Sequence, residues 1–258
     1  MLSIIRAEFY RLFNRVYLYV FFGILIVISV LTALTMNFPL NEVLSVSIFA
    51  LIIPVFLWPF LVDIVCGEEF TENTFVNTLA FGVSKTAIFI SKVIVSSILV
   101  IITVLVTVVT FLSSVFAFAN HNGITPEPLL GNYILAIFAA LPLYISAIII
   151  GILLMFVIKK NSLANLTYLV LFLCVNPLFE LLRLFGVNLE YLTNFMITKQ
   201  LVFLMGEIRS VNINTPKIKM NIIGGSIASQ DQMLTAAVIG LIYIISLLLL
   251  SVPVIRRK

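Results

Sequence analysis

The sequence predicts an all-α membrane protein with six transmembrane helices. Of its 258 residues, 62% are hydrophobic and only 10% are charged, whereas soluble domains carry about 25% charged residues. Mean hydropathy is +1.23. Six apolar stretches have about the 20 residues needed to cross a bilayer, at 17–36, 44–63, 93–119, 131–158, 164–183 and 232–254. We expect one transmembrane domain covering 1–258.

Residues 1–15 predict an amphipathic helix before the first span. Ile5, Phe9, Leu12 and Phe13 repeat at helical spacing, with charged residues around the rest of the turn. Such a helix is typical of the inner membrane interface. The alternative is a straight cytoplasmic extension of the first span. No cleavable signal peptide is expected here, because the segment has no short apolar region followed by a small-residue cleavage site.

The distribution of basic residues predicts the orientation. Lys and Arg are in excess on the cytoplasmic side of membrane proteins, and the short outer connections contain none. With the N-terminus inside, ten of the 15 basic residues are cytoplasmic: Arg6, Arg11, Arg15, Lys85, Lys92, Lys159, Lys160, Arg256, Arg257 and Lys258. We therefore expect a multi-pass protein of the cell membrane with both termini cytoplasmic. The basic balance then serves contact with anionic lipid, and no nucleic-acid partner is expected.

The second and third spans contain the residues that we consider for a transport pathway. Pro54 and Pro59 flank Trp58 in 44–63, so this span is expected to be kinked. In the third span, hydroxyl residues spaced 7, 4, 3 and 4 apart fall on one helical face. The pathway candidates are Trp58, Ser96, Thr103, Thr107, Thr110 and Ser114. The alternative for the hydroxyls is a hydrogen bond from each to its own helix backbone.

The fourth span carries small residues at a helix–helix seam. Ala136 and Ala140, and Ala147 and Gly151, are two pairs spaced four apart, and small residues let helix backbones approach closely. The pattern leaves open whether the seam lies within one subunit or between two.

The connection at 184–231 is predicted to be the longest extracellular segment. Asn176-Pro177 is expected to break the fifth span before its outer end. An amphipathic pattern follows it, which predicts re-entrant or interfacial outer helices. The stretch 208–225 is expected to be an exposed loop, with short strands left open.

No catalytic or metal site is predicted. The chain has one histidine, His121, so histidine-based triads and clusters have few possible members. Gly82-Val83-Ser84-Lys85-Thr86 lacks the glycine frame of a phosphate-binding loop, and no other nucleotide-binding pattern is present. We expect no enzyme activity and no cofactor in this chain.

The loop at 64–92 is the strongest functional signal. It places a charged, amphipathic stretch on the predicted cytoplasmic side, with Phe70, Phe75, Val76 and Leu79 on one side of a short helix. The simpler alternative is an ordinary interfacial loop.

In this loop the chain resembles the type-2 ABC exporter permeases. The segment 69–74 follows that family's Glu-Phe/Tyr-x-x-Gly-Thr pattern, with Asn73 where Gly is usual. Residues 82–85 follow its Pro-x-Ser-Arg-like turn with Gly for Pro and Lys for Arg, and Lys92 matches the Lys that opens the third span. Six spans, cytoplasmic termini, an N-terminal elbow helix and outer re-entrant helices extend the resemblance over the whole chain.

The resemblance implies a permease subunit that pairs with a second permease copy or paralogue and with two cytosolic ABC ATPase subunits. ATP and Mg²⁺ would bind to those ATPases. The coupling helix and its surroundings would contact them through Glu68, Glu69, Phe70, Asn73, Thr74, Phe75, Leu79, Ser84, Lys85 and Lys92. Size and composition are most similar to Gram-positive permeases for antimicrobial-peptide immunity and phenol-soluble modulin export. The implied cargo is therefore an amphipathic peptide or similar amphiphile. The alternative is a membrane sensor or scaffold that binds amphiphiles and a signalling partner without transport.

Overall fold

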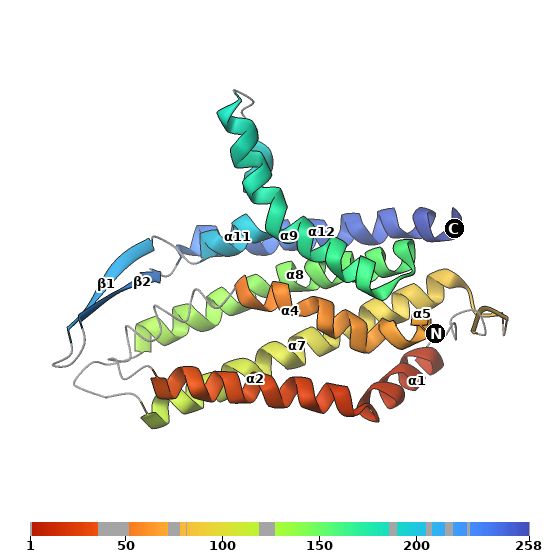
Figure 1. The fold of residues 1–258 in the computed structure, drawn as a ribbon, viewed down its shortest axis with the longest axis horizontal. Coiled ribbons are helices and arrows are strands. Elements are labelled where there is room, and N and C mark those ends of the chain that lie inside the picture. The colour runs from red at the N-terminus through yellow and green to blue at the C-terminus, as the bar shows by residue number, and fades with distance from the viewer. Residues whose placement is uncertain are drawn as a thin grey trace.

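The structure is a computed structural model of the chain (Figure 1). It describes residues 2–35, 52–71, 78–80, 82–118, 127–185, 190–204, 208–214, 219–225 and 228–257. Long helices lie side by side along the molecule, and the two termini lie at the same end (Figure 1).

The described elements are mostly helices. In chain order they are α1 (Leu2–Phe13), α2 (Val16–Thr35), α4 (Ile53–Val62), the π-helix η2 (Asp63–Gly67), α5 (Glu68–Thr71), α7 (Lys85–Phe118), α8 (Glu127–Ile158), α9 (Asn161–Leu184), α10 (Glu190–Asn194), α11 (Ile197–Leu204), β1 (Ile208–Asn214), β2 (Lys219–Gly225) and α12 (Gln230–Arg257).

Among the described residues, four helices are long and apolar enough to cross a membrane. They are α7, α8, α9 and α12, and a fifth is obtained if α1 and α2 are counted as one bent span. Helix α4 is a shorter apolar helix. Residues 36–51, which include the first part of the second predicted span at 44–63, lie outside the described residues. The prediction of a protein with several membrane-spanning helices is thus confirmed, while the count of six spans stays a prediction.

Helix α8 lies at the centre of the packing. It contacts α12, α9, α4 and α7. Gly240 of α12 lies against the backbone of α8, because a Cβ there would be 2.7 Å from Pro142 Cβ and 2.8 Å from Leu143 N. A Cβ on Gly151 would likewise be 2.9 Å from Val62 Cγ2. The predicted seam residues Ala136, Ala140, Ala147 and Gly151 are all buried inside this one chain.

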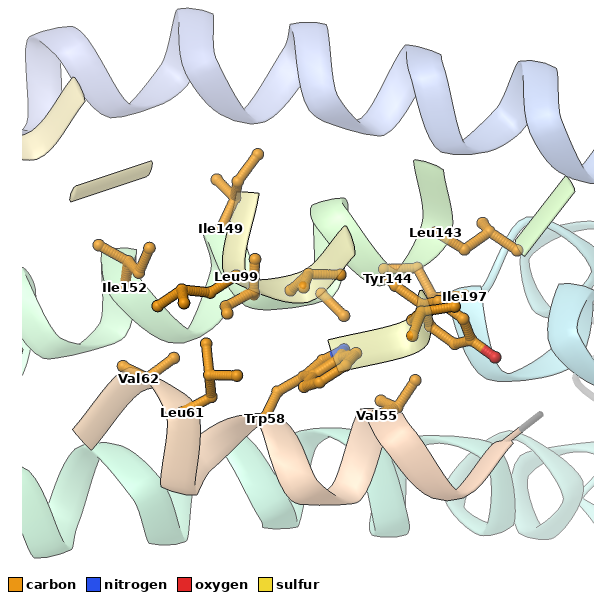
Figure 2. Close-up of a cluster of buried hydrophobic side chains, with 14 of the residues drawn as sticks. Val55, Trp58, Leu61, Val62, Leu99, Leu143, Tyr144, Ile149, Ile152 and Ile197 are labelled. Carbon is orange, nitrogen blue, oxygen red and sulfur yellow. The ribbon is translucent and has the colours of Figure 1, made fainter. Parts of the chain in front are cut away.

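The apolar core includes the residues around Trp58 (Figure 2). The Trp58 ring meets the Tyr144 ring edge to face, with centroids 5.8 Å apart. Val55, Leu61 and Leu99 are also fully or almost fully buried in this cluster. Close contact between aromatic and branched side chains of three helices makes this the densely packed part of the bundle.

The prediction that the fifth helix stops at Pro177 is wrong. Helix α9 continues through Pro177 to Leu184; it bends, and its later part projects from the bundle (Figure 1). Helix α7 begins at Lys85 and contains most of the predicted third span at 93–119. A proline removes one hydrogen bond from a helix but bending can accommodate it.

The helical prediction is confirmed for the spans, and the short strands that the sequence left open at 208–225 are present: β1 and β2 form an antiparallel hairpin with Val211 opposite Ile222. In residues 210–214 of β1, Val and Ile alternate with Ser and Asn, and β-branched residues favour strands. The hairpin lies at the end of the molecule away from the termini (Figure 1).

Candidate functional site

Lys92 of α7 is the centre of a buried cluster of charged side chains. Its Nζ donates to Glu8 Oε2 at 2.7 Å and to Glu69 Oε1 at 2.8 Å. It also donates to the Val65 carbonyl oxygen at 3.0 Å. Lys92 is fully buried, and both carboxylates are nearly so. One ammonium group therefore joins α1, α5 and η2 to the start of α7.

Arg11 completes the cluster from α1. It donates to Glu8 Oε2 at 2.6 Å, to the Glu69 carboxylate, and to the Val65 carbonyl oxygen at 3.3 Å. Glu8 and Arg11 are three residues apart, so they lie on the same helical face. We call the set Glu8, Arg11, Glu69 and Lys92 the charged junction.

The charges in the junction balance. Two carboxylates face two cations, and buried charges are tolerated when they are paired and hydrogen-bonded in this way. Burial opposes ionisation of Glu69, but Lys92 and Arg11 outweigh burial and hold the pKa of that carboxyl below its ordinary value. Glu69 therefore stays ionised and bound to both cations at neutral pH.

The π-helical turn η2 supplies further acceptors for the cations. The Val65 oxygen accepts from Lys92 and Arg11, and the Ile64 oxygen accepts from Arg15. A π-helix bonds five residues along instead of four, and such turns are frequent at functional sites. Side chains that insert into the backbone hydrogen-bond ladder are a known cause of such local departures from α-helical geometry.

A second connection reaches η2 from the first residue of α9, just after the turn that joins α8 to α9. Asn161 Nδ2 donates to Asp63 Oδ1 at 2.7 Å. Gly67 lies beneath this bond, since a Cβ there would be 2.3 Å from Asp63 Oδ1 and 2.7 Å from Asn161 Nδ2. Asp63 is thus tied to the first residue of α9 at this end of the bundle.

Phe70 is half-buried next to the junction and packs against the core. Its ring meets the Phe156 ring at 5.3 Å between centroids, and Phe89 meets Phe156 from another side at 5.4 Å. Such edge-to-face contacts stabilise an aromatic cluster beyond its area burial. Phe70 therefore anchors α5 to α8.

The structure brings together only part of the predicted docking set. Glu69, Phe70 and Lys92 meet around α5 with their side chains turned inward, while Leu79 packs partly buried against the core. Ser84 is exposed and caps α7, because its Oγ accepts from Ala87 N at 3.2 Å. Lys85, half-buried, begins that helix. Asn73, Thr74 and Phe75 lie outside the described residues, as do the Glu68 side chain and His121.

Most of the predicted pathway hydroxyls bond to their own helix. Thr103, Thr107, Thr110 and Ser114 each donate at 2.7 Å to a carbonyl four residues earlier. Ser96 is the exception among the five, since its Oγ is buried with no hydrogen-bond partner. These bonds agree with the alternative expected from sequence, and the pathway itself stays a prediction.

Trp58 is buried among apolar side chains in the core, with Nε1 also lacking a partner. Within the described ranges, no cluster of three or more His, Cys, Asp or Glu side chains is placed to hold a metal ion.

Sequence reasoning missed Glu8, Arg11 and Arg15 as members of the site. Glu8 lies on the same stripe of α1 as Ile5 and Leu12, three residues after one and four before the other. A carboxylate within an apolar stripe indicates burial beside a cation, and this signal would have found it. Asn161 had no comparable signal, because its role depends on how two distant loops meet.

The comparisons with known proteins give no identification. No model of a known protein family matches the chain, and no curated protein matches it.

Proposed function

We propose that the chain is the transmembrane subunit of an ATP-driven exporter of amphipathic peptides or similar amphiphiles. In this proposal it has six spans, cytoplasmic termini and α1 as an elbow helix. It pairs with a second permease copy or paralogue and with two cytosolic ATPases, which carry ATP and Mg²⁺.

The observation that carries the proposal is the charged junction. Glu69 and Lys92 occupy motif positions of the permease family that the sequence resembles, and both bind directly to α1. Helix α1 bends by 64° into α2. A force applied to the loop after α5 would therefore reach the helix that enters the first span.

The junction also changes how the predicted docking residues are understood. Glu69 and Phe70 face inward, so they position the loop, and we assign direct contact with the ATPase to residues 72–84. Asn73 and Phe75 are the best candidates, because an amide and an aromatic side chain can provide hydrogen bonds and buried area at an interface.

The test is ATP hydrolysis by the purified complex. The chain is co-expressed with a candidate ABC ATPase subunit from the same organism, reconstituted in nanodiscs, and assayed with a Lys-containing amphipathic helical peptide as probe. We expect the two proteins to copurify and the peptide to stimulate hydrolysis. The double variant Asn73→Ala, Phe75→Ala should lose copurification.

A matched double variant, Tyr191→Ala and Asn194→Ala, removes the same kinds of side chain from α10, where Tyr191 is highly exposed. It should keep copurification and basal hydrolysis. Equal loss in both double variants would contradict the docking assignment. Peptide binding by the chain with no ATPase association at all would overturn the exporter proposal in favour of the sensor alternative.

A further inference from the structure

The π-helical turn η2 is held by contacts from three directions. Arg11 reaches it from α1 and Arg15 from the turn before α2, while Lys92 reaches it from α7 and Asn161 from the start of α9. Val65, Cys66 and Gly67 of the turn are buried. Both connections at this end of the bundle therefore meet on the same five residues.

The local sequence of the turn does not require a π-helix. Before Gly67 it reads Asp63-Ile64-Val65-Cys66, which contains no proline or glycine to disturb an α-helix. The π-helix has the rarer hydrogen-bond pattern and appears mostly as single turns within α-helices. This turn is distinguished by its contacts. Cations bind to the Ile64 and Val65 carbonyl oxygens, and Asn161 donates a hydrogen bond to Asp63.

We infer that η2 is a switchable hinge. These cations and Asn161 hold it in the π form, and η2 can return to the α form when their contacts are released. A change from π to α register would turn the following segment by about 100° and shift it by about 1.5 Å along the axis. Glu69 and Phe70 would then leave their partners in the junction and on Phe156. Asn161 is a positioning residue for the hinge, because its bond to Asp63 holds η2 in the π form.

Gly67 makes the Asn161 clamp possible. A side chain at this position would collide with the bonded pair, since a Cβ would be 2.3 Å from Asp63 Oδ1. Gly67→Ala and Asn161→Ala should therefore disturb the same contact, and their effects should not add.

Cys66 is a native reporter of the hinge. It lies within the turn and is fully buried, whereas Cys174 is exposed. The test measures modification of Cys66 by N-ethylmaleimide in the full chain carrying Cys174→Ser, in nanodiscs and without any ATPase. Modification should be slow, because a buried thiol reacts only when the structure around it opens.

We expect Asn161→Ala and Lys92→Met each to raise the rate about tenfold or more, since labelling follows the population of the open form. Ser162→Ala, at the exposed neighbouring position, is the matched control and should leave the rate unchanged. The double variant Gly67→Ala, Asn161→Ala should react about as fast as the faster single variant.

General unfolding is detected by a second thiol. In a separate background with Cys66→Ser and Cys174→Ser, Ile148→Cys reports on α8, where Ile148 is fully buried. The inference requires Cys66 to become reactive while the α8 thiol stays protected. It is overturned if the two thiols become reactive together, if neither responds, or if the Gly67 and Asn161 effects multiply. Because no ATPase is present, failure here is separate from failure of the proposed function.

Discussion

The charged junction and the core around Trp58 stabilise the bundle in different ways. In the junction, Glu8, Arg11, Glu69 and Lys92 join α1 and α5 to α7 through a few directional bonds. In the core, helices touch through apolar side chains and through close approaches at Gly151 and Gly240. Packed contacts resist small displacements in all directions, whereas ion pairs can exchange partners. This difference suits a bundle whose apolar core moves as a unit. The charged junction is then its adjustable part, and it lies beside the loop to which we assign ATPase contact.

The largest expected effect is on the junction. Lys92→Met leaves two buried carboxylates that share the single cation Arg11, and breaking a buried ion pair in this way costs about 3–5 kcal/mol. We expect a fall of that size in the free energy of unfolding in detergent. Neutralising one carboxylate as well, with Glu8→Gln, should restore much of it, because Glu69 and Arg11 then balance each other. A double variant less stable than Lys92→Met would contradict the ion-pair account.

The next effect is on the core. Gly240→Ala places a Cβ 2.7 Å from Pro142 Cβ and 2.8 Å from Leu143 N, and overpacking costs about 1–3 kcal/mol. Thermal unfolding should therefore occur at lower temperature. Gly23→Ala is the control, because nothing lies within 4 Å of its Cβ position and alanine favours a helix interior by about 0.5–1 kcal/mol. Equal responses at the two sites would show that α12 does not pack against α8 as described.

Acid should weaken the junction and leave the core unaffected. The pKa of Glu69 is lowered below its ordinary value of 4.5 in the folded protein. Ionised Glu69 therefore stabilises the fold above pH 4.5, and that contribution is lost as the pH falls through the lowered pKa. Unfolding free energies measured from pH 7 downward should show this loss, and Glu69→Gln should remove part of the dependence. Identical pH profiles for both proteins would be inconsistent with the assignment.

The smallest effect on stability is expected from the hydroxyl stripe. Thr107 bonds to the Thr103 carbonyl of its own helix at 2.7 Å, so Thr107→Val should change the free energy of unfolding by no more than about 0.5 kcal/mol. Peptide-stimulated ATP hydrolysis would fall if the stripe lines the pathway. Unchanged stimulation would remove Thr107 from the pathway.

The sequence predicts elements better than it predicts contacts. Apolar length places α2 and α8 within a few residues of their observed ends, because a bilayer requires long uninterrupted apolar helices. The hairpin at 208–225 was only left open, since short alternating segments carry a weak signal. Glu69 and Lys92 were selected by motif, yet their contacts with Arg11 and Glu8 of α1 depend on how α1 folds back. The clamp of Asn161 on Asp63 joins positions nearly a hundred residues apart, and a single sequence contains no trace of it.

Glu69 of α5 ties the segment that follows η2 to α1. Hydrogen exchange of α1 amides in the intact chain measures this connection, with α12 as an internal reference. Replacing Glu69 with Gln removes the charge that Arg11 and Lys92 share, so amides at 2–13 should exchange faster while those of α12 stay unchanged. Protection of α1 equal to that of the unmodified chain would contradict the account.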